Sequence, residues 1–427
     1  MKAYQEMSRE ELLQEKQELE QQYKEYCAKG LNLDMSRGKP SAEQLDLSMP
    51  MMDVLNSQSS LHSRKGTDIR NYGMVDGIDE AKELIADMID TKPENVIVYG
   101  NASLNIMYDC ISRSMVFGVL GSTPWVHLDK VKFLCPVPGY DRHFAITESF
   151  GIEMINVPMT PEGPDMDMVE ELVSKDDAIK GIWCVPKYSN PQGISYSDET
   201  VRRFARLKPA AEDFRIYWDN AYCVHHLYED KQDELLDIIS ECEKAGNPDM
   251  VYEFCSTSKI TFSGAGISGL ATSLRNKEAI LKRLTVQTIG FDKINQLRHV
   301  KFLKNKQGIL EHMMKHAALI RPKFEMILDR FDKELKDRGA GTWVVPNGGY
   351  FITYEANEGC AKAIIAKAKE AGVVMTGAGA PYPYKKDPKD SVIRIAPTLP
   401  PMEELEAATE IFIICVKLAS IEKLLEG

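Results

Sequence analysis

The stretch from Cys255 to Gly269 could serve either of two functions: a reactive lysine or a glycine loop that binds a dinucleotide. The stretch reads CSTSKITFSGAGISG, with Lys259 near its centre. Three hydroxylated residues precede this lysine: Ser256, Thr257 and Ser258. An amine in such a setting can act as a nucleophile toward a carbonyl compound. Three glycines follow in the spacing G-x-G-x-x-G, which is typical of dinucleotide-binding loops: Gly264, Gly266 and Gly269.

The context of the glycines argues against a dinucleotide site. A dinucleotide-binding loop follows a strand and opens a helix. Here the residues after Gly269 read LATSL, which indicates a strand, and the next helix is predicted only from about Asn276. The glycines are therefore predicted to form a tight turn near a buried ligand.

Polar motifs follow the predicted strands of the chain. Short apolar runs at 95–99, 131–135, 181–186, 214–219 and 251–255 alternate with helical patterns such as 78–90 and 102–117. This alternation predicts a mostly parallel sheet covered by helices on both faces. Ligands bind beyond the carboxyl ends of strands in such sheets. Four motifs lie at those ends: Gly100 to Ser103, Pro138 to Tyr140, Asn190 to Gly193, and Asp219 to Tyr222.

The two ends of the chain have a different pattern. A capping box from Ser8 to Glu11 begins a polar helix that is expected to reach about residue 29. A loop is predicted at 35–41, and a long helical stretch at 293–338. Strands are predicted within 342–355, 373–380 and 391–398, followed by a closing helix at 402–424. These segments indicate a smaller α+β unit.

The composition excludes several classes of protein. The net charge of −12 argues against a nucleic-acid-binding surface. The nine cysteines show no C-x-x-C spacing and no Cys/His cluster, so neither a metal site nor a disulfide framework is expected. The charged N-terminus does not resemble a signal peptide, and no run of 18 apolar residues predicts a membrane span. We expect a cytoplasmic protein with small-molecule partners.

The ordered motifs resemble the class I aminotransferases of the pyridoxal-phosphate fold type I superfamily. They are Gly38, YGMVDG, YGNAS, PGY, NPQG, DNAY, STSK and VIRIAPT. The residues in and around these motifs are most similar to those of a divergent bacterial aspartate aminotransferase subgroup. The resemblance implies a large domain with a mostly parallel seven-stranded sheet and a smaller α+β domain built from both termini. The expected ranges are 1–65 for the N-terminal arm and part of the small domain, 66–305 for the large domain and 306–427 for the rest of the small domain.

The resemblance also implies three catalytic residues and a cofactor, pyridoxal 5′-phosphate. Lys259 would bind the cofactor covalently and then move the proton. Asp219 would pair with the pyridinium nitrogen. Tyr222, with Asn190, would donate hydrogen bonds to the phenolate oxygen. Taken alone, each has a plainer explanation: a surface lysine, a helix-capping aspartate, and an Asn-Pro turn.

Further binding residues follow from the same resemblance. The cofactor phosphate would be held by a helix start and two serines: Asn101, Ala102, Ser103, Ser256 and Ser258. Tyr140 would stack on the ring, and Tyr72 would reach the phosphate of a neighbouring subunit, which implies a homodimer; both could instead be core tyrosines. Arg394, Gly38 and Asn190 would bind the substrate, although a strand arginine could also face solvent.

The chain departs from the family pattern at two points. Ile267 occupies the position, eight residues after Lys259, where most relatives carry a phosphate-binding arginine. Either another cation, a realigned loop or the glycine amides near Ser263 and Gly264 would replace it. The cation for a distal substrate carboxylate stays open among five residues: Arg37, Lys39, Arg142, Lys187 and Arg298.

The expected reaction is transfer of an amino group between an L-amino acid and a 2-oxo acid. Aspartate and 2-oxoglutarate are favoured by the resemblance. The alternatives are another enzyme of the same fold, such as a β-lyase or decarboxylase, a non-catalytic sensor domain, and a structural homodimer with a decayed site.

Overall fold

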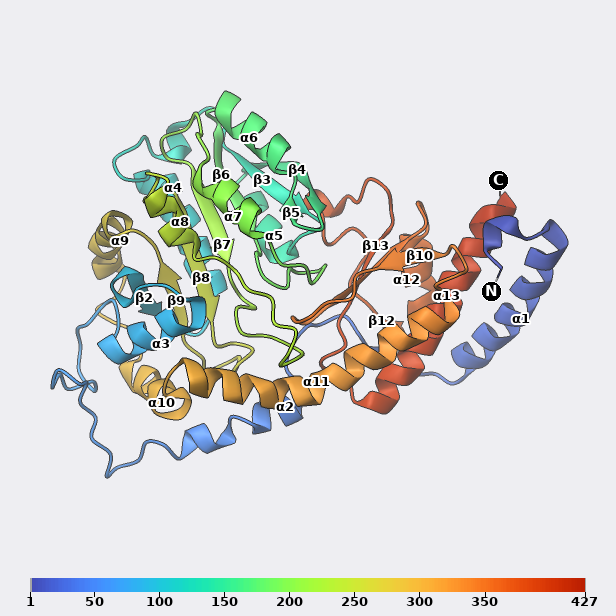
Figure 1. Cartoon of the computed structure of the whole chain (residues 1–427), viewed down its shortest axis with the longest axis horizontal. Helices are drawn as coiled ribbons and strands as arrows, with labels where there is room; N and C mark the ends of the chain where they lie inside the picture. Colours follow the sequence, from blue (N-terminus) through green and yellow to red (C-terminus); the bar gives the residue numbers. More distant parts are fainter. Residues whose placement is uncertain (1, 427) are drawn as a thin grey trace.

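The computed structural model describes residues 2–426, and its largest element is an eight-stranded sheet (Figure 1). The strand order is β2-β9-β8-β7-β6-β3-β4-β5. Strands β4, β3, β6, β7 and β8 run parallel, whereas β9 is antiparallel to both its neighbours and β5 is antiparallel to β4. The strand bounds are β2 Val96–Tyr99, β3 Lys132–Val137, β4 Glu153–Thr160, β5 Gly163–Pro164, β6 Ile179–Cys184, β7 Arg215–Asp219, β8 Val251–Ser256 and β9 Ser268–Ala271.

The central strands are buried on both faces, which explains why most of their residues are apolar. One face packs on the helices α3 (Asp79–Ile89), α6 (Met166–Lys175), α7 (Asp198–Ala205), α8 (Ile238–Lys244) and α10 (Lys293–Leu303). The other face packs on α4 (Ser103–Phe117), α5 (Asp141–Ser149) and α9 (Leu274–Gln287). The core of this second face includes three mutually packed aromatic rings: Phe133, Trp183 and Tyr217.

A smaller lobe combines both ends of the chain. β10 (Gly341–Trp343), β11 (Ile352–Ala356) and β13 (Val392–Ile395) form an antiparallel sheet, and β1 (Leu33–Asp34) pairs with β12 (Val373–Val374). The helices α1 (Arg9–Ala28), α12 (Ala361–Glu370) and α13 (Met402–Glu426) pack in the same lobe. The long helix α11 (Lys306–Glu334) runs from the large sheet to this lobe in Figure 1.

Short helices complete the chain. α2 spans Ala42–Asp46, and five 3-10 turns cover Tyr4–Glu6, Met49–Met52, Pro93–Asn95, Trp125–His127 and Pro383–Lys385. None of the helices within residues 2–426 combines the length and the apolar character needed to cross a lipid bilayer.

The predicted α/β fold is confirmed, with three differences in detail. The sheet has eight strands rather than seven, because the two-residue strand β5 extends its edge. The strand β4 was not predicted, since its buried positions are interrupted by partly buried and exposed ones. The long helical stretch is two helices: Lys304 has a φ of 66°, and Asn305 caps α11 through a hydrogen bond from Gly308 N. The domain boundaries stay a prediction.

Candidate active site

The predicted polar motifs meet at the carboxyl ends of β7 and β8. Asp219 is the last residue of β7, and Lys259 follows β8 by three residues. Between them lies a cavity of about 200 Å³. Its lining includes nine of the predicted site residues: Ala102, Ser103, Tyr140, Asn190, Asp219, Tyr222, Ser256, Ser258 and Lys259.

Asp219 presents one free oxygen and one bonded oxygen. Its Oδ2 lies 2.8 Å from Nε2 of His143, whereas its Oδ1 is buried and has no hydrogen-bond partner. His143 is held on α5 by its stack against Trp183, with ring centroids 4.4 Å apart. A buried carboxylate oxygen without a partner requires a donor. The free oxygen therefore fits a protonated ring nitrogen of a bound group.

Sequence reasoning missed His143. The available signal was its position in the first turn of the helix that follows Tyr140, a strand-end residue. Nothing in the sequence indicated that this turn would bring the ring to Asp219 on another strand.

The amine of Lys259 lies among aromatic rings. Its Nζ is 4.9 Å from the ring centroid of Tyr222 and 5.9 Å from that of Tyr350. Burial lowers the pKa of Lys259 from its usual 10.5, an effect that the nearby Asp219 carboxylate opposes. Burial also raises the pKa of Tyr222 well above its usual range, so its hydroxyl stays a hydrogen-bond donor. A larger share of neutral amine makes Lys259 a better nucleophile.

The predicted phosphate-binding segments are tied together. Ser258 Oγ donates to the carbonyl of Asn101 (3.1 Å), and Asn101 Nδ2 donates to the carbonyl of Ser263 (3.3 Å). Ala102 is the N-cap of α4 and has no side-chain cap. The first amides of this helix are therefore available to an anion at the cavity.

The structure gives Ile267 and the glycine loop structural roles. Ile267 is buried in the core, and its backbone bonds both Thr257 N and Thr257 Oγ1. Ser263 and Gly264 are exposed and do not line the cavity. A Cβ on Gly266 would lie 2.7 Å from Thr257 Oγ1, so this position requires a glycine. The tight-turn interpretation agrees with these contacts, and of the predicted phosphate-binding groups the cavity is lined by Ser256 and Ser258 and not by Gly264.

Arg394 lies on β13, is 9% exposed and contacts Asn190, a residue of the cavity wall, although it does not itself line the cavity. Its Nη1 donates to Asp141 Oδ1 and to Asn190 Oδ1, both at 3.2 Å, and its Nε is buried without a partner. The guanidinium lies 4.9 Å from the ring centroid of Phe351. The solvent-facing alternative is therefore excluded. Sequence reasoning missed Asp141, the counter-ion of Arg394.

Gly38 supports Arg394 through the same ring. A Cβ at residue 38 would lie 2.3 and 2.5 Å from ring carbons of Phe351. We expect Gly38→Ala to push this ring against Arg394 and raise the KM for the amino acid about tenfold, with a smaller effect on kcat. Steady-state kinetics measure both constants. Gly377→Ala, at a glycine with open space around it, is the control and should leave KM unchanged. Equal KM values for the two variants would contradict this role.

The remaining predicted residues lie outside the cavity. Tyr72 is 78% exposed, so it is not a core tyrosine. Arg37, Lys39 and Arg142 are exposed.

Two other candidate cations already have partners within the chain. Lys187 donates to the carbonyl of Cys223 at 2.9 Å. Arg298 donates to Asn295 Oδ1 at 2.6 Å.

The sheet order, the small lobe and the Lys–Asp pair at the strand ends define a fold type I aminotransferase, and comparisons with known proteins agree. A family model described as aspartate amino-transferase matches residues 7–427, and the chain belongs to this family. The chain is a transaminase.

Close relatives extend over almost the whole chain. The aspartate aminotransferase of Corynebacterium glutamicum is 45% identical over 95% of this chain and 94% of its own. A putative aminotransferase of Mycolicibacterium smegmatis is 45% identical over 99% of both. The crystal structure of an aspartate transaminase from C. glutamicum has a TM-score of 0.96 and 43% identity, with 99% of each chain covered.

Proposed function

We propose that the enzyme binds pyridoxal 5′-phosphate at the 200 Å³ cavity and transfers amino groups between L-aspartate and 2-oxoglutarate. The observation that carries the proposal is that an amine, Lys259, and the unbonded carboxylate oxygen of Asp219 belong to residues that line the same cavity. The aspartate aminotransferase of C. glutamicum, 45% identical, supports the choice of substrate.

The residues around the cavity fit such a cofactor. Pyridoxal phosphate supplies an electron sink for the bond that is broken at the substrate Cα. Asp219 would hold the proton on the ring nitrogen, because a carboxylate favours a neighbouring positive charge. Asn190 and Tyr222 would donate to the phenolate oxygen; the Oδ1 of Asn190 is already used by Arg394, which leaves its Nδ2 for this bond. Tyr140 would pack against the ring.

Substrate binding and proton transfer fall to two further residues. Arg394 would hold the α-carboxylate through its Nε, which has no partner in the chain, and through the second N–H of Nη2, whose other N–H donates to Thr376 Oγ1 at 3.1 Å. Lys259 would act as the general base that takes the proton from the substrate Cα and as the general acid that gives it to the cofactor carbon on the other side of the amino nitrogen. The lowered pKa of Lys259 increases the share of its neutral, basic form compared with an ordinary lysine.

Covalent uptake of the cofactor should depend on pH with a defined sign. Only the neutral amine attacks an aldehyde, so the rate of uptake rises with pH through the pKa of Lys259. Because this pKa is lowered from 10.5, we expect the half-maximal rate at a pH below 10.5. Stopped-flow absorbance of cofactor-free protein mixed with pyridoxal phosphate measures this profile. A midpoint at or above the value for a free lysine would contradict the burial effect.

Single-turnover spectroscopy tests the function. Addition of L-aspartate without an oxo acid should convert the absorbing form to a stable amine form and release one oxo acid per site, and 2-oxoglutarate should reverse the change. A β-lyase or decarboxylase would release a different product, and a sensor domain or decayed site would release none. A protein that takes up no pyridoxal phosphate would refute the proposal.

We further propose a homodimer with shared sites, in which the exposed Tyr72 reaches the partner's phosphate. Mixing Tyr72→Phe with Lys259→Ala chains tests this, because a mixed dimer would regain one intact site.

We place the enzyme in the cytoplasm because its nine cysteines are all free thiols.

A further inference from the structure

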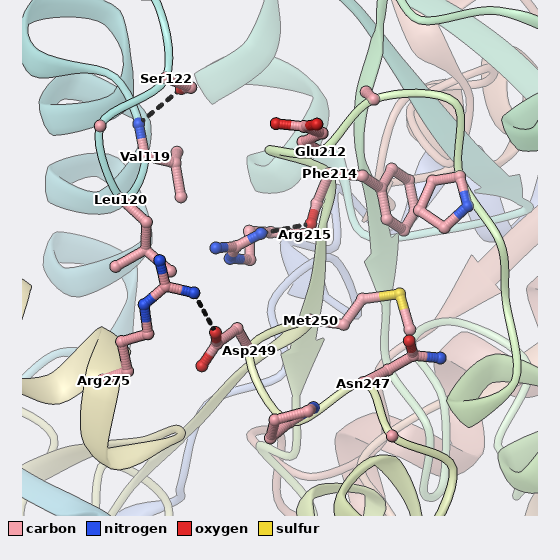
Figure 2. A pocket seen from close by; sticks show the side chains of 15 residues that line it. Val119, Leu120, Ser122, Glu212, Phe214, Arg215, Asn247, Asp249, Met250 and Arg275 are labelled. Atoms are coloured by element: carbon pink, nitrogen blue, oxygen red, sulfur yellow. Dashed lines mark hydrogen bonds and ion pairs between the residues drawn. The ribbon is translucent and has the colours of Figure 1, made fainter.

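A second cavity lies at the amino ends of β7 and β8, and Figure 2 shows the side chains that line it. Its volume is about 460 Å³, and it is lined by the loop that follows α4 and by the loops that precede β7 and β8. Arg215 begins β7 and Asp219 ends it, so the Cα atoms of these two residues are about 13 Å apart along the strand. The cavity is therefore separate from the one beside Lys259.

Arg215 is a buried cation without a counter-ion. It is 2% exposed. Its Nη1 donates to the carbonyl of Phe214 (2.7 Å) and its Nη2 to Asn276 Oδ1 (3.3 Å), while its Nε is buried without a partner. Its guanidinium lies 5.7 Å from the ring centroid of Tyr252.

None of these partners carries a negative charge. Arg215 also forms no ion pair with any carboxylate in the described part of the chain, residues 2–426. A buried charge of this kind is unfavourable unless an anion accompanies it.

The other charges at the cavity do not neutralise Arg215. Arg275 pairs with Asp249 at 3.0 Å, so these two charges compensate each other. Glu212 is exposed on the rim, where solvent screens its charge. In Figure 2 Arg215 lies between Glu212 and the Arg275–Asp249 pair, with its guanidinium directed toward Leu120. Apolar side chains form much of the remaining wall: Val119, Leu120, Phe214 and Met250.

An adjoining cavity extends this space. Its volume is about 390 Å³, and it shares Leu120 and Arg275 with the first. It adds Arg113, whose Nη1 lies 3.5 Å from Asp109 and is buried without a hydrogen bond. A second poorly satisfied guanidinium therefore faces the same region.

We infer that this cavity binds a small organic anion, a carboxylate or phosphate ester, whose oxyanion bonds Arg215 and whose apolar body packs against Leu120 and Met250. A guanidinium matches the geometry of both oxyanions. The volume lies within the range of small-molecule sites. Leu120 and Met250 in the wall give a hydrocarbon part of the anion an apolar contact. The proposal does not depend on the substrate of the transaminase.

Calorimetric titration of the pyridoxal-phosphate-loaded enzyme tests the site. The probes are phenyl phosphate and benzoate, which share one apolar body and differ in the oxyanion, so the stronger of the two identifies the preferred class. We expect saturable binding at one site per chain in addition to any binding of benzoate at Arg394. Arg215→Gln should weaken this binding about tenfold or more, because it removes a charge-assisted hydrogen bond and leaves Arg394 intact.

The matched control is Arg64→Gln. Arg64 is exposed, pairs with Glu83 at 2.6 Å and lines neither of these two cavities, so this variant should bind the probes like the unaltered enzyme. If Arg215→Gln does not fold, Arg275→Gln replaces it: this exposed substitution leaves Asp249 unpaired at the cavity and should also weaken binding. The inference is overturned if neither probe binds saturably, or if the folded cavity variants bind as tightly as the control.

Discussion

Lys259→Ala should abolish transamination, with kcat reduced at least about 10⁴-fold, because the substitution removes both the covalent anchor and the proton carrier. Among the residues that line the cavity in the described part of the chain, Lys259 alone has an amine that can form a carbon–nitrogen bond with an aldehyde. Borohydride treatment followed by peptide mass spectrometry gives a second readout. A phosphopyridoxyl group should be found on the peptide that contains residue 259 in the unaltered enzyme and nowhere in the variant.

Lys323→Gln is the matched control for this experiment. Lys323 is also a buried lysine with a lowered pKa, but it donates to the carbonyls of Thr398 and Pro400 and does not line the cavity. It should retain activity and modification at residue 259. Labelling at another lysine in the unaltered protein would show that the assignment of Lys259 is wrong.

The second large effect is expected at Asp219. Asp219→Asn keeps the shape of the side chain and removes the charge, so the proton on the cofactor nitrogen loses its electrostatic support. We expect kcat to fall about 10²- to 10³-fold, the usual cost of one preorganised electrostatic contact. Cofactor affinity should fall less, because the phosphate contacts are untouched. Steady-state kinetics and equilibrium titration with pyridoxal phosphate separate the two effects.

Asp237→Asn serves as the comparison, since Asp237 caps α8 and asparagine caps a helix equally well. It should leave kcat unchanged. If Asp219→Asn were as active as Asp237→Asn, the unbonded oxygen of Asp219 would have no role in the reaction.

The sequence predicted those parts of the site that a strand end determines by itself. Asp219 and Lys259 could be placed because the runs at 214–219 and 251–255 are short and mainly apolar, so their ends were recognisable. His143 and Asp141 could not, because their roles arise from contacts with β7 and β13, at long sequence separation. Local patterns carry no information about such tertiary contacts.

The same limit applies to the edge of the fold. The strand β4 has only two buried residues among partly buried and exposed ones, and β5 has only two residues, so neither has the mainly apolar run that marks the central strands. The helix break near Lys304 depends on a positive φ at a lysine, which sequence preference does not favour. The position of Arg215 in the wall of a cavity could not be predicted either, since a single arginine at the start of a strand has no distinctive sequence pattern.

The pairing of β1 with β12 has a consequence for the order in which the protein matures during synthesis. Leu33 and Val373 are register partners, so the first strand waits for almost the whole chain to leave the ribosome. The cofactor-facing residues from Ala102 to Lys259 are translated before that point. Gly38 and Arg394, by contrast, are brought together only when the last strands arrive. A nascent chain should therefore form the proposed cofactor pocket before Arg394 is in place to bind a substrate carboxylate.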